Sequence, residues 1–152
     1  MVRRNFWNLL AVFGGAMTAM AAARTKSKKQ FLNPGDQKPP GYTHVVTSPP
    51  GKMVFISGQG GTGDDGKMPA DFATQATNTF KHLAKCLQMG GVTFKDVVKI
   101  NYYLTDIGNL QTLRQIRANY LNMEAPPAAT AVQTGLSGGM LVEIECIAVI
   151  PE

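Results

Sequence analysis

The sequence predicts an α+β fold, a mixed β-sheet with two helices packed on one face. Residues 71–89 and 109–121 repeat apolar side chains at steps of three and four, the spacing of a helix with one buried side. Other stretches alternate apolar and polar residues, as half-buried strands do. The order is β-β-α-β-α-β-β, with an extra edge strand expected in front at residues 31–34. Helices layered on one face of the sheet bury both kinds of apolar surface.

The chain has 152 residues, enough for one domain with a substantial core. Its net charge is +5 at pH 7, but six of its 15 lysines and arginines precede residue 30. The rest of the chain therefore has nine basic and ten acidic residues. Because a body of near-neutral charge lacks the basic surface that follows a phosphate backbone, we expect no nucleic-acid partner.

The first 23 residues have the three parts of an export signal. Arg3 and Arg4 supply the charged start, residues 9–23 form an apolar run, and residues 21–23 are small, as at a cleavage site. Arg-Arg-Asn-Phe resembles the twin-arginine class of signals. The apolar run has 15 residues, which is shorter than the roughly 20 that a membrane-spanning helix needs.

These features divide the chain into three parts. Residues 1–23 are the export signal, residues 24–41 a basic lead-in and loop, and residues 42–152 the folded domain. We expect a protein of the periplasm, or one otherwise exported by a bacterium, that has no membrane contact once the signal is removed. The alternatives are a membrane anchor and an unprocessed tail.

The first half of the domain is expected to begin with a hairpin. Residues 42–47 and 53–56 are strand candidates on either side of Pro49-Pro50-Gly51, a turn sequence. The apolar run 53–56 predicts a buried strand. A glycine-rich loop is expected over residues 57–63, but it has neither the GxGxxG pattern nor the Lys-Ser/Thr of a phosphate-binding loop.

The two helices and the strand between them follow from periodicity. The first helix, capped by Asp71 and ended by Gly90-Gly91, has one apolar stripe made of Phe72, Ala76, Phe80, Leu83 and Leu87. A strand is expected over residues 97–104, with Val98, Ile100, Tyr102 and Leu104 alternating with Lys99, Asn101 and Tyr103. Asn109 is expected to cap the second helix, whose apolar side has Leu110, Leu113, Ile116 and Tyr120.

The end of the chain predicts two strands joined by a glycine-rich turn. Residues 128–134 follow two prolines, and residues 141–149 follow Gly135, Gly138 and Gly139. In the last strand, Glu143 and Glu145 share one face. Two carboxylates on one strand face indicate either a solvated surface or a polar site.

This closing stretch resembles the RidA/YjgF family of enamine/imine deaminases. Pro-Pro-Ala-x-Thr, a glycine-rich turn and Val-Glu-Ile-Glu-x-Ile-Ala carry the likeness. Five shorter motifs precede them in the family's order: Pro-Gly-Tyr, Phe-Ile-Ser-Gly-Gln, Pro-Ala-Asp-x-x-x-Gln-Ala, Val-Val-Lys and Leu-Thr-Asp. The likeness therefore runs from about residue 31 to residue 149. The resemblance implies a chorismate-mutase-like fold, a homotrimer and small-molecule sites in the clefts between subunits.

The resemblance also implies roles for particular residues. Glu143 would orient or deprotonate the water that attacks the C=N carbon. Glu145 would be structural. The ligand would be contacted by Tyr42, by the backbone around Ser57 and Gly58, and by the strand that carries Asn101.

One position departs from the family pattern. The family usually has Pro-Ala-Arg-Ser/Thr, whose arginine grips the substrate carboxylate, but this chain has Ala129, and Ala131 replaces a frequent cysteine. Loss of two charged hydrogen bonds at about 1.5–3 kcal/mol each weakens binding by roughly 10²- to 10⁴-fold. Arg114 and Arg117 lie on the predicted second helix and are not obvious substitutes.

We therefore expect an imine or enamine hydrolase whose substrate is not a simple 2-imino acid. The alternative is a non-catalytic trimeric module of the same family that binds a ligand or acts as a holdase. Endoribonuclease activity, an older label of the family, is disfavoured by the near-neutral body of the chain.

The remaining reactive side chains do not form a recognisable site. His44, His82, Cys86 and Cys146 lack metal-ligand spacing, so we expect no metal and no cofactor. The two cysteines are expected to be buried thiols, with a disulfide in an oxidising compartment as the alternative.

The twin-arginine interpretation makes a direct prediction. In a bacterial host, changing Arg3→Lys together with Arg4→Lys should hold the precursor in the cytoplasm, because this class of signal is read through its arginine pair. Immunoblots of cytoplasmic and periplasmic fractions measure the distribution. An equal periplasmic yield from the double variant and the parent would contradict the interpretation.

Overall fold

The computed structural model describes residues 28–35 and 38–152. The export signal expected over residues 1–23 lies outside the described residues. The elements are β1 Gln30–Leu32, β2 Val45–Thr47, β3 Gly51–Gly60, α1 Phe72–Met89, β4 Val97–Leu104, α2 Leu110–Arg117, β5 Ala128–Gln133 and β6 Val142–Pro151, with short 3-10 turns at Phe94–Asp96 and Ile107–Asn109. Within the described ranges, no helix has the length and apolarity that crossing a membrane requires.

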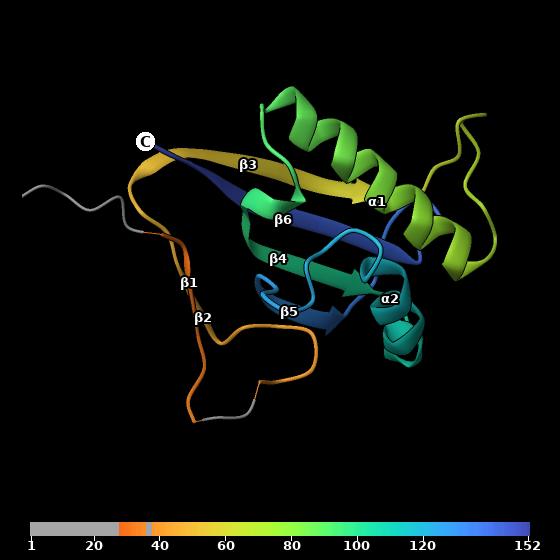
Figure 1. The fold of residues 1–152 in the computed structure, drawn as a ribbon. Coiled ribbons are helices and arrows are strands. Elements are labelled where there is room, and N and C mark those ends of the chain that lie inside the picture. Colours follow the sequence, from red (N-terminus) through yellow and green to blue (C-terminus); the bar gives the residue numbers. More distant parts are fainter. Residues whose placement is uncertain (1–27, 36–37) are drawn as a thin grey trace, which may run out of the picture.

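A four-stranded mixed sheet forms the centre of the molecule, in the order β3-β6-β4-β5. Strand β6 runs antiparallel to both of its neighbours, and β5 runs parallel to β4. Helices α1 and α2 lie together on one face of this sheet (Figure 1). The predicted α+β class and the order of the elements are confirmed.

The expected closing hairpin is wrong, because β4 lies between β5 and β6. The reason is the difference in apolar content between the two strands. Strand β6 buries Val142, Ile144, Cys146 and Ala148 under the helices, and this packing requires a central place in the sheet. Strand β5 is exposed from Thr130 to its end and therefore suits the edge.

The expected first hairpin is also wrong. Strand β2 pairs with β1, with Phe31 opposite Val46, in a separate two-stranded sheet, whereas β3 pairs with β6. Strand β3 must join the main sheet because Val54 and Ile56 pack against its core. It runs through Gly60, so the first part of the predicted glycine loop is strand.

The sequence predicted that residues 53–56 form a buried strand, but only one face of β3 packs against the core. Met53 is 52% exposed and Phe55 is 68% exposed, and both lie on the face turned away from the helices. The side chains alternate because the helices cover only one face of the sheet. The open face of the sheet therefore has exposed apolar side chains at its β3 edge.

The first helix confirms its prediction in detail. The Asp71 carboxylate accepts a hydrogen bond from the Thr74 backbone amide at 2.8 Å, and Gly90 follows the last residue of α1. Every member of the apolar stripe is buried. Phe80 lies at its centre, with its ring stacked 4.8 Å from that of Tyr120.

The second helix and β4 differ from prediction at their ends. Helix α2 ends at Arg117, and the Asn109 side chain makes no capping bond, because a 3-10 turn capped by Asp106 precedes the helix. The pairing of β4 with β6 has a bulge between Val97 and Lys99. Val97, rather than Val98, is therefore the buried residue at the start of this strand.

The stacked position of Phe80 predicts a large contribution to stability. Phe80→Ala should lower the free energy of unfolding by about 3–5 kcal/mol, because the fully buried ring leaves a cavity. Urea unfolding followed by circular dichroism measures the change. The neighbouring exposed change Lys81→Ala is the control and should stay within about 0.5 kcal/mol. Equal stability of the two variants would contradict this account of the core.

Candidate functional site

A β-bulge shapes the open face of the sheet. The pairing of β3 with β6 passes from Ile56 opposite Cys146 to Gln59 opposite Ile144, so one extra residue enters β3. Ser57 and Gly58 occupy this bulge and together face the single residue Glu145. Bulges of this kind redirect side chains and are frequent beside active sites.

The bulge places Gly58 directly against Glu143. A β-carbon built at Gly58 would overlap the Glu143 carboxylate, so the absence of a side chain at this position makes room for it. In the β4 pairing, Glu143 lies opposite Tyr103. Within the described part of the chain, no hydrogen bond holds the Glu143 carboxylate. Its oxygens are therefore available to a water or a ligand.

The second glutamate of β6 is held by two donors. The Glu145 carboxylate accepts hydrogen bonds from Asn101 Nδ2 and from the Tyr103 hydroxyl, both at 2.8 Å. The Asn101 amide, followed by the Tyr103 hydroxyl, lowers the pKa of Glu145 below its ordinary value. The same bond to Glu145 raises the pKa of Tyr103. Two hydrogen bonds thus hold the Glu145 carboxylate in place. Asn101, which was expected beside the ligand, uses its side-chain amide to bind Glu145 instead.

A hollow of about 250 Å³ opens beside this network on the open face. Its polar lining comes from three strands, and its lining residues are Phe55, Ile56, Ser57, Lys99, Asn101, Glu145, Cys146 and Ile147. The Lys99 ammonium donates to the Thr130 hydroxyl at 2.8 Å and so ties this rim to the edge strand β5.

The other expected ligand residues lie in a second hollow, of about 160 Å³, between α2 and β5. It is lined by Pro40, Tyr42, Tyr102, Leu110, Arg114, Arg117, Ala129, Thr130 and Ala131. The sequence had set the two arginines aside because they lie on a helix. Their spacing of three residues, which puts two side chains on one helix face, was the signal that could have indicated a shared site.

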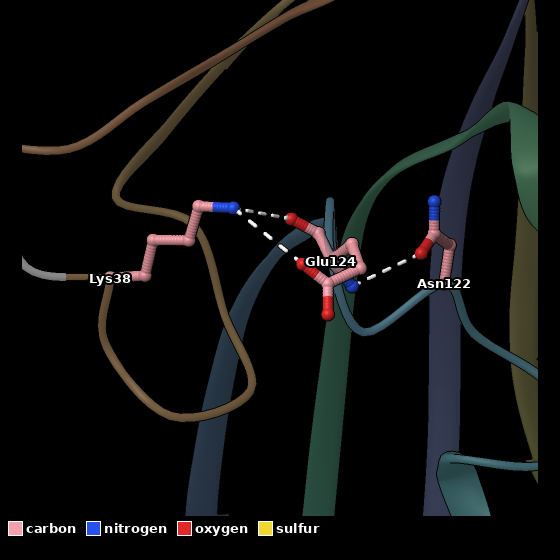
Figure 2. A network of polar contacts seen from close by, with 3 residues as sticks. All are labelled: Lys38, Asn122 and Glu124. Carbon is pink, nitrogen blue, oxygen red and sulfur yellow. Dashed lines mark hydrogen bonds and ion pairs between the residues drawn. The ribbon is translucent and has the colours of Figure 1, made fainter.

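The wall that carries Tyr42 is fixed to the segment preceding β5. The buried Thr43 hydroxyl donates to the Pro126 carbonyl at 2.6 Å, and the Thr43 amide donates to the Pro127 carbonyl at 3.2 Å. Nearer the surface, the Lys38 ammonium donates to the backbone carbonyl of Glu124 at 3.3 Å (Figure 2). The same ammonium lies 3.8 Å from the Glu124 side-chain carboxylate. This outer ion pair is exposed and adds little stability, so Thr43 is the main anchor.

A single chain does not bring all the predicted site residues together. Ser57, Gly58, Asn101 and Glu143 belong to the open face, whereas Tyr42, Ala129 and Ala131 belong to the helix side. Ala129 pairs with the buried Ile100, so its side chain lies on the face opposite Glu143. Within this chain, Ala129 and Glu143 therefore lie on opposite faces of the sheet.

The remaining candidates are separate from both hollows or enclosed in the core. His82 Nδ1 lies 2.9 Å from the Gly60 carbonyl, and His44 Nδ1 lies 3.0 Å from the Asn33 side-chain oxygen. Cys86 and Cys146 are both free thiols, and burial raises the pKa of Cys146 to about 12. Among the residues that the structure describes, no three His, Cys, Asp or Glu side chains are grouped as metal ligands.

Comparisons with known proteins give a consistent result. The family model described as Endoribonuclease L-PSP matches residues 37–150. The chain is 33% identical to the mitochondrial protein mmf2 of Schizosaccharomyces pombe over 111 residues, which are 70% of this chain and 86% of mmf2. It is 32% identical to the 2-iminobutanoate/2-iminopropanoate deaminase of Rattus norvegicus over 100 residues, 64% of this chain and 73% of the rat protein.

A solved structure shows the same arrangement of elements. RidA from the Antarctic bacterium Psychrobacter sp. PAMC 21119 is 34% identical and superposes with a TM-score of 0.62. The match covers 72% of this chain and 88% of that protein.

Proposed function

The chain belongs to the RidA/YjgF family, and from this premise we propose that it hydrolyses reactive imines and enamines to carbonyl compounds and ammonia. The observation that carries the proposal is the Glu143 carboxylate, which lies against the Gly58 backbone with no hydrogen-bond partner among the described residues. The deaminase name of the rat relative supports the same class of reaction.

The chemistry needs one proton-transferring group next to a water. Water adds to the C=N carbon while Glu143 takes its proton, and the imine nitrogen is protonated to give a carbinolamine. Glu143 then transfers the carbinolamine hydroxyl proton to the amine nitrogen, the C–N bond breaks, and ammonia leaves a carbonyl product. Glu143 suits this role better than Glu145, whose carboxylate already accepts two hydrogen bonds and has a lowered pKa.

A homotrimer completes the site in this proposal. Each subunit has a water-activating half at Gly58 and Glu143 and a ligand-holding half at Tyr42, Ala129 and Ala131, on opposite sides of its sheet. A cleft between subunits joins the first half of one subunit to the second half of its neighbour. The exposed side chains of Met53, Phe55 and Val132, three strongly apolar groups on one sheet, support such an interface.

The substrate in this proposal is not a simple 2-imino acid. In the family pattern, an arginine at position 129 would extend from β5 and bind the substrate carboxylate. This chain has only the methyl group of Ala129 there, and Ala131 adds no polar atom. These two residues also favour the second candidate function, a non-catalytic trimeric module that binds a small ligand or acts as a holdase. Activity outside the cytoplasm is part of the proposal as well, because the chain starts with a twin-arginine-type sequence.

The role of Glu143 is tested by imine turnover. An oxidase generates imines from a panel of amino acids and amines, and semicarbazide traps what remains. Glu143→Gln should lower the hydrolysis rate by about 10²- to 10⁴-fold, because the attacking water loses its base. Glu145→Gln, on the same face of β6, is the matched control and should have a smaller effect.

Two results would contradict this assignment. Equal rates for Glu143→Gln and the parent would exclude Glu143 as the base. A parent protein that accelerates the loss of no imine in the panel would instead favour the binding module.

Assembly is tested through Phe55. Light scattering of the purified protein should give three times the subunit mass, and Phe55→Glu should yield monomers, because it places a charge in the apolar interface. Lys52→Glu adds a glutamate to the same strand on its other face and should leave the trimer intact. A monomeric parent, or a trimeric Phe55→Glu variant, would contradict the proposed interface.

A further inference from the structure

We propose that Arg114 and Arg117 bind a carboxylate of the ligand in the hollow beside Ala129, so that α2 supplies the cation that β5 lacks. The inference rests on the proposed imine hydrolysis and narrows its substrates to anionic ones. It gives a role to two arginines that are not obvious substitutes on sequence grounds, because they lie on the second helix.

Arg117 is an unusual residue because its charge is buried without a counter-charge. The residue is 5% exposed, and its Nε is fully enclosed without a hydrogen-bond partner among the described residues. In the same described ranges no carboxylate lies within 4.0 Å of its guanidinium. Buried arginines are almost always paired, because an unpaired buried charge is costly. An anionic ligand would provide the pairing.

The surrounding backbone is shaped around this guanidinium. Gly41 has a left-handed φ of 82°, and a β-carbon built there would overlap Arg117 Nη2. The missing side chain therefore lets the chain close over the charge, while Thr43 fixes the same segment to Pro126 at 2.6 Å. Such a fitted wall holds the guanidinium in place before a ligand arrives, which reduces the entropy lost on binding.

The other polar groups of the hollow do not neutralise Arg117. The Tyr102 ring lies 5.7 Å from the guanidinium carbon. Its buried hydroxyl has no well-aligned hydrogen-bond partner among the described residues, but it lies close enough to Arg117 to interact with that side chain. A neutral hydroxyl supplies no counter-charge. Burial raises the pKa of Tyr102 to about 12, with the Arg117 charge opposing the shift, so the hydroxyl is a neutral donor at pH 7. Arg114, one helical turn before Arg117, adds a second positive charge to the same lining.

This arrangement selects a particular placement of the carboxylate. Two guanidiniums can bind one carboxylate through parallel N–H···O bonds. They reach the hollow from the helix layer, whereas a side chain at position 129 would reach it from the sheet. A carboxylate bonded directly to the imine carbon would hold that carbon close to α2. We therefore assign to the site imines whose carboxylate is separated from the imine carbon by a short chain.

Stable carbonyl compounds test this assignment without turnover. Calorimetric titration of the full-length protein compares 4-oxopentanoate, the uncharged 2-pentanone of the same chain length, and 2-oxobutanoate. We expect 4-oxopentanoate to bind at least about tenfold more tightly than either of the others. Arg114→Gln and Arg117→Met should each weaken its binding by roughly 10- to 100-fold and leave 2-pentanone unaffected.

If Arg117→Met fails to fold, Arg114→Gln still tests the assignment, because Arg114 is exposed. Lys81→Gln on α1 removes the same charge away from the hollow and serves as the control. Equal binding of 4-oxopentanoate and 2-pentanone, or unchanged binding by the Arg114 variant, would overturn the carboxylate assignment. Binding of 2-oxobutanoate as tight as that of 4-oxopentanoate would overturn its placement. If the carboxylate assignment fails, the proposed reaction can still be tested separately. Hydrolysis of uncharged imines that is lost in Glu143→Gln would show that the reaction stands although the assignment is wrong.

Discussion

The central position of β6 is the constraint on which the rest of the structure depends. Its buried side chains, from Val142 to Ala148, complete the core beneath the helices, so the strand must lie between β3 and β4. The alternation of a strand then turns Glu143 and Glu145 to the open face. The position of the carboxylates is therefore a consequence of packing on the opposite side of the same strand.

Two glutamates of one strand face acquire different properties from their neighbours. Glu145 lies opposite Asn101 and beside Tyr103, which donate to it and hold it ionised. Glu143 lies against the backbone of the bulge, where Gly58 makes room for it but donates nothing to its oxygens among the described contacts. One extra residue in β3 thus separates a structural carboxylate from a candidate reactive one.

The sequence predicted what depends on local periodicity and missed what depends on distant pairing. Asp71 and the apolar stripe of α1 define that helix within 19 residues, and the structure agrees. The two hairpins were inferred from closeness along the chain, yet strand pairing is decided by which faces need a core. Val98 was misplaced because a bulge shifts the alternation by one residue. Arg117 was named but set aside because it lies on a helix, and its contact with Gly41, which is far away in sequence, could not be seen from the sequence.

The separation of the two hollows by the sheet has a consequence for divergence within the family. In the part of the chain that the structure describes, residues on the helix side, such as Ala129 and Arg117, share no hydrogen bond with Gly58 or Glu143 on the open face. A substitution on one side therefore removes none of the hydrogen bonds described for the other side of the same chain. If the proposed roles hold, a lineage with this fold could exchange the groups on the helix side while the Glu143 carboxylate keeps its place on the open face.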